Sequence, residues 1–309
     1  MKPRTLAALA LFGFAAAIAA NALVARRAEQ RHPPRGRFLS VEGVRLHVRE
    51  AGPPNAPVIV LVHGNLVHAQ DWWESGVAPL LARTHRVIAF DRPGCGFSAR
   101  PLGRLWTPAA QAALLAQALR HLGVGPAVLV GHSLGVQVCL RLALDFPAHV
   151  RSLVLVSGYF MPRFRADSLL AGVQALPLIG DAALWTLTSP LARALGRITA
   201  KLLFSPRRAP ERFIKQILPL SFRPGQLRAT LEDGFFMWPE AMALARRYRE
   251  ISVPALVLAA DEERVVHQQR QSPALVERLA SGRLVWLGAA GHMAHYTATE
   301  RIVDAIRES

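Results

Sequence analysis

Short apolar runs alternate along this chain with longer stretches of helical periodicity. The apolar runs cover residues 58–62, 87–90, 127–130, 150–156, 253–260 and 283–287. Runs this short and this apolar predict strands that are covered on both faces of a sheet. Residues 107–122 and 133–146 instead space Ala and Leu as a helix does, and Thr107-Pro108 is a favourable helix start. This alternation predicts an α/β fold with a doubly wound, mostly parallel sheet.

Two stretches depart from this rhythm. Residues 38–50 alternate apolar and polar positions on each side of Glu42-Gly43, which predicts a β-hairpin. Residues 159–250 are long, interrupted by prolines, and rich in aromatic residues and arginine. We interpret them as a helical cap inserted into a core that comprises residues 38–158 and 251–309. Ordinary helix packing is the default role for the cap's aromatic side chains.

The N-terminal residues 1–25 form a candidate membrane anchor or signal segment. A basic start precedes an apolar run over residues 6–25, which ends at Arg26-Arg27. Ala20-Asn21-Ala22 resembles a cleavage site, and cleavage there would give an exported protein. The apolar run nevertheless continues to the basic pair, which is typical of an uncleaved single span, so we expect a membrane-anchored protein. Residues 26–37 read as a basic linker. The membrane face stays open, because the excess of arginine after the span favours a cytoplasmic domain and the signal-like start favours export.

Charge and cysteine content limit which binding partners and metal sites are expected. There are 37 Lys and Arg residues against 21 Asp and Glu residues, a formal net charge of +16. The arginines are scattered and form no recognisable nucleic-acid-binding module, so no nucleic acid partner is expected, whereas an anionic membrane surface suits the charge. Cys95 and Cys139 belong to no CxxC or Cys/His cluster. The sequence therefore predicts no metal site, and buried free thiols are expected.

The strongest chemical signal is the pentapeptide Gly131-His-Ser-Leu-Gly135, a G-x-S-x-G pattern between a predicted strand and a predicted helix. A serine at this position stands on a sharp turn, and its flanking glycines let strand and helix backbones pass closely. Taken alone, the pentapeptide also fits an ordinary glycine-rich turn. Three further motifs follow other predicted strands: His63-Gly64, the segment 91–98 (DRPGCGFS) and Gly291-His292. Because the carboxyl ends of parallel strands share one edge of a sheet, we expect these motifs to lie together.

In this order and context, the four motifs resemble those of the α/β-hydrolase superfamily, over residues 36–158 and 251–309. The resemblance implies that Ser133 is a nucleophile, and a serine hydroxyl needs a general base to remove its proton as it attacks. His292 matches the family's base, and His295 is the fallback. The oxyanion hole would be formed by the backbone N–H groups of Leu134 and Asn65.

The triad acid is less clearly marked. Family members often carry a glycine after the penultimate strand and an acid three residues later. That pattern puts Ala260 at the glycine and Glu263 at the acid, although an aspartate is more usual there. Asp261 is the alternative, since it is shorter and nearest the strand end. A third interpretation makes both residues solvated loop acids.

The resulting prediction is a serine hydrolase that cleaves a carboxylic ester through an acyl-enzyme, with no cofactor or metal. Its expected partners are a small-molecule ester with an apolar or lipid-like group, and a membrane through the N-terminal segment. Related serine chemistry stays open: hydrolysis of C–C bonds, amides or lactones, and perhydrolysis. A non-catalytic binding protein on the same fold is the alternative from another class. Haloalkane dehalogenases and epoxide hydrolases use a carboxylate at the elbow, so Ser133 argues against them.

Overall fold

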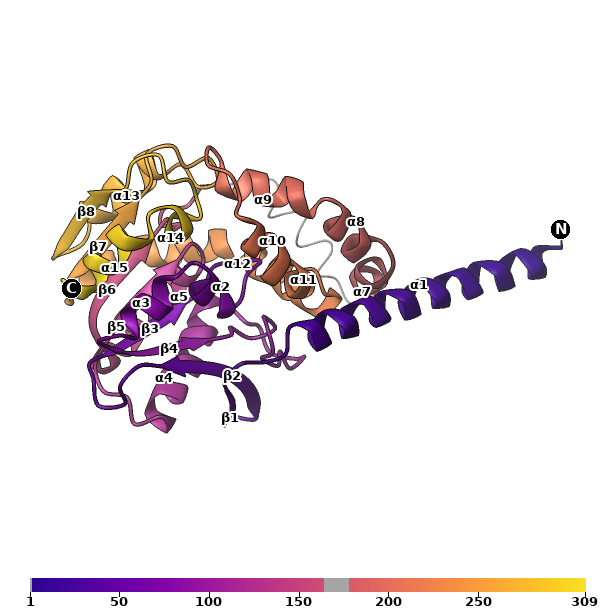
Figure 1. Cartoon of the computed structure of the whole chain (residues 1–309), viewed down its shortest axis with the longest axis horizontal. Coiled ribbons are helices and arrows are strands. Elements are labelled where there is room, and N and C mark those ends of the chain that lie inside the picture. The colour runs from indigo at the N-terminus through magenta and orange to yellow at the C-terminus, as the bar shows by residue number, and fades with distance from the viewer. Residues whose placement is uncertain (1, 164–177) are drawn as a thin grey trace.

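The protein is described here from a computed structural model, which covers residues 2–163 and 178–309. In this part of the chain an eight-stranded sheet carries helices on both faces, and one long helix projects from the body (Figure 1). The strands are β1 (Arg37–Val41), β2 (Val44–Ala51), β3 (Val58–Val62), β4 (Arg86–Phe90), β5 (Ala127–His132), β6 (Val150–Val156), β7 (Ala255–Ala259) and β8 (Gly282–Trp286).

The strand order is β1-β2-β4-β3-β5-β6-β7-β8. The predicted hairpin forms β1 and β2, and β2 is antiparallel to β4, while every pair from β4 to β8 is parallel. This arrangement confirms the predicted doubly wound, mostly parallel sheet. Val62 of β3 lies opposite Phe90 of β4 and Gly131 of β5, so the carboxyl ends of these central strands meet at one edge.

Helices of the core follow the strands and cover both faces of the sheet. They are α2 (Gln70–Glu74), α3 (Val77–Leu81), α4 (Pro108–His121), α5 (Gly135–Asp145), α13 (Gln268–Val276), α14 (Ala294–Thr297) and α15 (Thr299–Arg307), with short turns η1 (Pro147–His149) and η3 (Tyr248–Glu250). Helix α4 begins as predicted, because the Thr107 side chain accepts a hydrogen bond from the N–H of Ala110.

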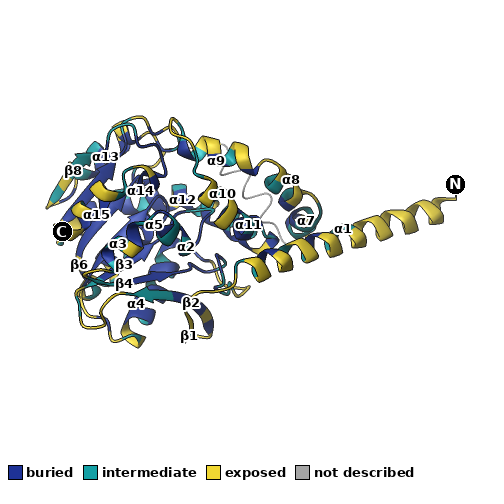
Figure 2. Ribbon diagram, viewed as in Figure 1, coloured by how far each residue is buried: buried dark blue, intermediate teal, exposed yellow. Residues whose placement is uncertain are grey.

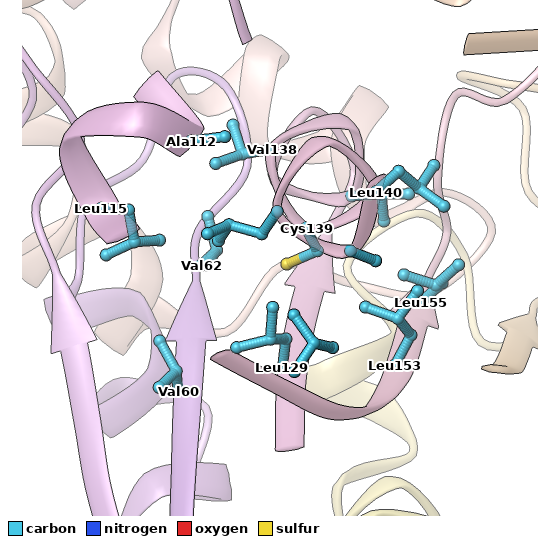
Figure 3. Packing of buried hydrophobic residues seen from close by; sticks show 14 of the residues in the cluster. Val60, Val62, Ala112, Leu115, Leu129, Val138, Cys139, Leu140, Leu153 and Leu155 are labelled. Atoms are coloured by element: carbon cyan, nitrogen blue, oxygen red, sulfur yellow. The ribbon is translucent and has the colours of Figure 1, made fainter. Parts of the chain in front are cut away.

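Alternate residues of the central strands enter two separate cores. On one face, Val60 and Leu129 pack against α4 and α5, where Val138 and Cys139 are buried (Figure 3). On the other face, Ile59 and Leu61 belong to a cluster that includes residues of α3 and α15. Because a strand presents successive side chains to opposite faces, coverage on both sides requires the continuous apolar runs seen in the sequence.

A helical insertion lies between β6 and β7, as expected for the cap. Its elements are α7 (Ile179–Ala183), a π-helical turn η2 (Leu184–Thr188), α8 (Ser189–Ala194), α9 (Gly196–Phe204), α10 (Glu211–Gln216), α11 (Leu218–Ser221) and α12 (Pro224–Ala245). Residues 164–177 of the expected cap lie outside the described residues. Phe204 and Phe213 are fully buried and pack edge to face, in line with the packing role assumed for the cap's aromatic side chains.

The N-terminal helix α1 (Pro3–Arg31) is exposed over most of its length (Figure 2). By length and composition it could cross a membrane, and a signal sequence passes the same test. The helix continues beyond the apolar run to Arg31, so the first half of the expected linker is helical. Asn21 marks where α1 meets the body, since its side-chain amide donates to the carbonyls of Leu184 and Trp185 in the cap.

Candidate active site

Ser133 lies at the sharp turn between β5 and α5. Its φ is +52°, in the left-handed region that side chains other than glycine rarely occupy. A Cβ on Gly135 would lie 2.3 Å from the carbonyl oxygen of Val62, and one on Gly131 would lie 2.8 Å from the Cα of Val136. The backbone approaches expected from the sequence therefore exist, and they leave no room for a side chain at either glycine.

Ser133, His292 and Glu263 form a connected line of side chains. His292 follows β8, and its Nε2 lies 3.0 Å from the Oγ of Ser133. On the other side of the ring, Nδ1 lies 3.0 Å from Oε1 of Glu263. All three residues are buried, with exposed fractions of 6%, 3% and 5%. The arrangement has the order hydroxyl, imidazole, carboxylate that nucleophilic catalysis by serine requires.

Backbone donors hold the Glu263 carboxylate in place. Its Oε1 accepts hydrogen bonds of 2.7 and 2.8 Å from the N–H groups of Val265 and Val266, in the loop between β7 and α13. Burial alone would raise the pKa of Glu263, but His292 and these donors outweigh it and hold the pKa below its usual value. The carboxylate is therefore charged at neutral pH.

Asp261 is placed differently. Its side chain is partly exposed, and among the described residues its hydrogen bonds are made by its backbone: the N–H donates to Gly288 and the C=O accepts from Gln269. Its carboxylate makes no ion pair with His292 in the described part of the chain.

His295 contacts a different acid. Its Nε2 lies 2.7 Å from Asp71, which also accepts from the hydroxyl of Tyr296. Its ring packs at a centroid distance of 4.4 Å on His132, and His132 packs in turn on His292. His132 Nε2 donates to the carbonyl oxygen of His292. Burial, together with the neighbouring histidines, puts the pKa of His132 well below its usual value, so this ring is a neutral support for the His292 loop.

Asp71, His132 and His295 also place their possible ligand atoms within 4.8 Å of one another, a spacing that could hold a metal ion. The Asp71 carboxylate is already occupied by two hydrogen-bond donors, as described above. We therefore interpret the group as the support behind His292. Asp71 belongs to none of the four motifs, and its only local signal in the sequence is its place just after the His63-Gly64 loop.

The loop after β3 is fixed by His63. Its Nδ1 donates to the carbonyl of Gly64, and its Nε2 accepts from the N–H of Arg92. Burial and the Arg92 charge hold the pKa of His63 well below its usual value, which keeps the ring neutral and suited to both bonds. In the next residue, Asn65, the side-chain amide donates to the carbonyl of Thr230 in α12. Among the described residues, the backbone N–H groups of Asn65 and Leu134 donate to no other group.

A buried ion pair ties the cap to the same edge of the sheet. Arg92, after β4, contacts Asp233 of α12, and Gln111 of α4 also donates to Asp233. Arg100 reaches the other side of this carboxylate at 3.0 Å. Arg92 and Asp233 are 141 positions apart in the chain, so no local pattern in the sequence could have revealed the pair.

Comparisons with known proteins agree on the family. A family model described as alpha/beta hydrolase fold matches residues 57–299. A protein of Klebsiella pneumoniae subsp. pneumoniae named "Putative carbamate hydrolase RutD" is 29% identical over 280 residues, which cover 86% of this chain and 95% of that protein. An alpha/beta hydrolase fold protein from Burkholderia ambifaria shares the fold, with a TM-score of 0.74, 23% identity and coverage of 90% of this chain and 100% of that chain. The enol-lactonase from Burkholderia xenovorans LB400 has a TM-score of 0.71 and 20% identity, and the match covers 88% of this chain and 98% of that one. The chain belongs to the alpha/beta hydrolase family and is a hydrolase of that fold.

Proposed function

We propose that this protein is a serine hydrolase that cleaves a carboxylic ester through a covalent acyl-enzyme. The observation that carries the proposal is the buried line from Ser133 Oγ to His292 Nε2, and from His292 Nδ1 to Glu263 Oε1, with 3.0 Å at each step. Each distance is within hydrogen-bond range, so a proton can leave the hydroxyl as it attacks.

In the first half of the reaction, Ser133 Oγ attacks the ester carbonyl carbon while His292 Nε2 takes the hydroxyl proton. Glu263 holds the ring with Nδ1–H toward it and stabilises the imidazolium that forms. The carbonyl oxygen becomes negative and is held by the free N–H groups of Leu134 and Asn65. The C–O bond to the alcohol then breaks, and His292 returns its proton to the departing oxygen.

In the second half, water replaces the alcohol. His292 removes a proton from the water as its oxygen attacks the acyl carbon, and the tetrahedral species collapses with return of the proton to Ser133 Oγ. The products are a carboxylic acid and the free enzyme. Every proton and charge in this cycle is handled by side chains and backbone groups of the chain itself.

Carbamate hydrolysis is the second candidate, favoured by the similarity to the RutD protein, whose name proposes that activity, over most of both chains. The same residues would act, and the acyl group would be a carbamoyl group. Lactone, amide, C–C and peracid chemistry use the same nucleophile and are separated from ester hydrolysis by substrate alone.

We further propose that residues 1–25 anchor the protein in a membrane through α1, with residues 26–37 as a basic connector. In this proposal, residues 38–158 and 251–309 form the catalytic core and residues 159–250 the cap. The exposed apolar surface of α1 supports the anchor, because eighteen or more apolar residues exposed to water are unfavourable. Cleavage at Ala20-Asn21-Ala22 is the alternative, and the intact mass of the purified protein distinguishes the two.

The test is hydrolysis of p-nitrophenyl esters of increasing chain length, and of a p-nitrophenyl carbamate, by the wild type and by Ser133→Ala. We expect the variant to lose at least about 10³-fold in kcat/KM on the preferred substrate. Equal rates in both proteins would reject the mechanism. Labelling by a fluorophosphonate, which needs an activated serine, tests Ser133 as the nucleophile even if none of these substrates is the preferred one.

A further inference from the structure

A large cavity, whose lining does not include Ser133, lies between α1, the loop that joins β4 to α4, and α12. Its volume is about 1130 Å³. Its lining includes none of the triad residues or oxyanion donors proposed above. Pockets that bind small molecules usually measure about 300–1,000 Å³, so this cavity has room for a sizeable ligand.

The lining of the cavity includes aromatic residues and exposed leucines. Trp106, Trp185 and Phe236 are among the lining residues. Leu102 and Leu105, in the loop before α4, are 80% and 72% exposed. Large apolar side chains gathered at the mouth of an apolar cavity are typical of a site for an apolar ligand.

The charges around the cavity leave an excess of positive charge at one end. Three of its arginines are paired: Arg100 with Glu232 and Asp233, Arg223 with Glu29, and Arg228 with Asp181 and Glu232.

Arg45 and Arg104 differ from these three. No carboxylate of the described residues is within ion-pair distance of Arg45, and Arg104 has a single partner, Glu42, at 3.5 Å on the open surface. Both guanidinium groups stack on aromatic rings, those of Phe38 and Trp106, which holds them in place. An anionic group at this end would find two positioned cations.

The other end of the cavity lies beside the proposed anchor. Ala25 of α1 and Trp185 both line the cavity, and the Trp185 carbonyl accepts from Asn21 at 2.9 Å, where α1 meets the body. The projecting part, residues 3–20, is about 27 Å long at 1.5 Å per residue. A bilayer's hydrocarbon core is about 30 Å thick. A span of this length brings the Asn21 contact, and with it the Trp185 end of the cavity, to the membrane interface.

We propose that this cavity is a second, non-catalytic binding site, which takes a single-chain amphiphile with an anionic head group, such as a long-chain fatty acid, from the membrane interface. The chain lies against the rings of Trp106, Trp185 and Phe236, and the carboxylate contacts Arg45 and Arg104. The membrane source rests on the proposed anchoring by α1, whereas the ligand chemistry rests on the cavity itself.

The test uses the full chain with Ser133→Ala, so that labelling cannot depend on turnover. The protein is reconstituted in lipid nanodiscs that contain stearate with a photoreactive diazirine in its chain, and labelled peptides are mapped by mass spectrometry. We expect labels on residues 94–106 and 224–236, and at least tenfold fewer when the probe is the corresponding neutral alcohol. Labels confined to residues 3–20 would overturn the proposal, because they would report contact with bulk lipid only.

Variants separate the head-group contact from general charge. Arg45→Gln combined with Arg104→Gln is expected to reduce labelling at least tenfold, whereas Arg120→Gln, at an exposed position of α4 outside the cavity, leaves it unchanged. Phe236→Asp places a charge in the apolar part of the cavity and is expected to reduce labelling without changing the head-group contact. Equal labelling of the double variant and the Arg120→Gln control would reject the site.

The source of the ligand is tested in a second arm, with the protein held in an amphipathic polymer without a bilayer and the probe added from solution. Labelling in both arms is expected, and labelling in the polymer arm alone would overturn the membrane source. Ester hydrolysis by the wild type is measured separately, so failure of this site and failure of the proposed function are distinguishable.

Discussion

The role of the acid beside His292 gives the sharpest prediction. Replacing Glu263 with Gln removes one negative charge while keeping the side chain's length. The two backbone donors, Val265 and Val266, are expected to hold the Gln carbonyl oxygen where Oε1 now lies, because only that oxygen can accept both N–H groups. That oxygen still faces His292 Nδ1, so the ring keeps its tautomer. The variant therefore tests the charge rather than the orientation.

The size of the effect follows from the distance. Oε1 lies 3.0 Å from Nδ1, so the charge centres of the carboxylate and the imidazolium are about 4 Å apart. At an effective dielectric constant of about 20, two unit charges at that separation interact by about 4 kcal/mol. Since about 1.4 kcal/mol corresponds to tenfold in rate, Glu263→Gln should lower kcat by about 10³-fold. A larger loss, about 10⁴-fold, is known where the tautomer is lost as well.

The assay is ester hydrolysis by the wild type, Glu263→Gln and Asp261→Asn under the same conditions. The Asp261 variant is the matched control, because it removes a loop carboxylate two residues away that has no ion pair with His292 in the described chain. It should keep its activity within about threefold. If Asp261→Asn were the damaged variant and Glu263→Gln retained full activity, the assignment of the acid and the electrostatic reasoning would both be wrong.

Three further predictions concern buried residues that support the fold around the site. Gly135→Ala should destabilise the fold by about 3 kcal/mol or more in urea unfolding, because the new Cβ would meet the Val62 carbonyl oxygen at 2.3 Å. Gly125→Ala is the control, because a Cβ at Gly125 meets no atom within 4 Å, and it should change the free energy of unfolding by less than about 1 kcal/mol. Asp91→Asn should cost about 2–4 kcal/mol at pH 7, because buried Asp91 accepts from Ala69, Phe97 and His47. Burial alone would raise the pKa of Asp91, but the hydrogen bond and charge of His47 hold it below its usual value. The stabilisation by Asp91 is therefore full above the unfolded pKa of about 4 and disappears as pH falls through the lower folded pKa. A difference in unfolding free energy between wild type and Asp91→Asn that grew toward acid pH would contradict this reasoning. Cys95 and Cys139 should react with iodoacetamide at least about 100-fold faster after unfolding, because burial raises the pKa of both thiols, that of Cys95 to about 12.

Local backbone chemistry made much of the fold predictable. The strands β3 to β6 stand where continuous apolar runs were found, and α4 begins at its Thr107-Pro108 signal. The elbow was equally readable, because a strand and a helix that meet at a tight turn leave no space for Cβ atoms at Gly131 and Gly135. In each case, residues that are adjacent in the sequence determine the local structure.

Other parts were less readable from the sequence. The spacing after β7 favoured Glu263 over Asp261 as the acid, but residue type could not decide between two acids in one loop, and the difference lies in which carboxylate reaches the N–H groups of Val265 and Val266 and the ring of His292. The end of α1 at Arg31 was missed for a different reason, one of local helix propensity. Arginine and glutamate are good helix formers, so a polar composition did not require the helix to stop at Ala25.

The position of α12 bears on how the site can open. Asp233 of this helix pairs with Arg92 and Arg100, and Thr230 accepts from Asn65 in the loop after β3. Moving α12 away from the sheet would leave these buried charges without partners, at a cost of about 3–5 kcal/mol for one pair. The same movement would pull on Asn65, whose N–H is proposed to stabilise the oxyanion. The helix is therefore better understood as a fixed wall beside the loop that carries Asn65 than as a moving lid.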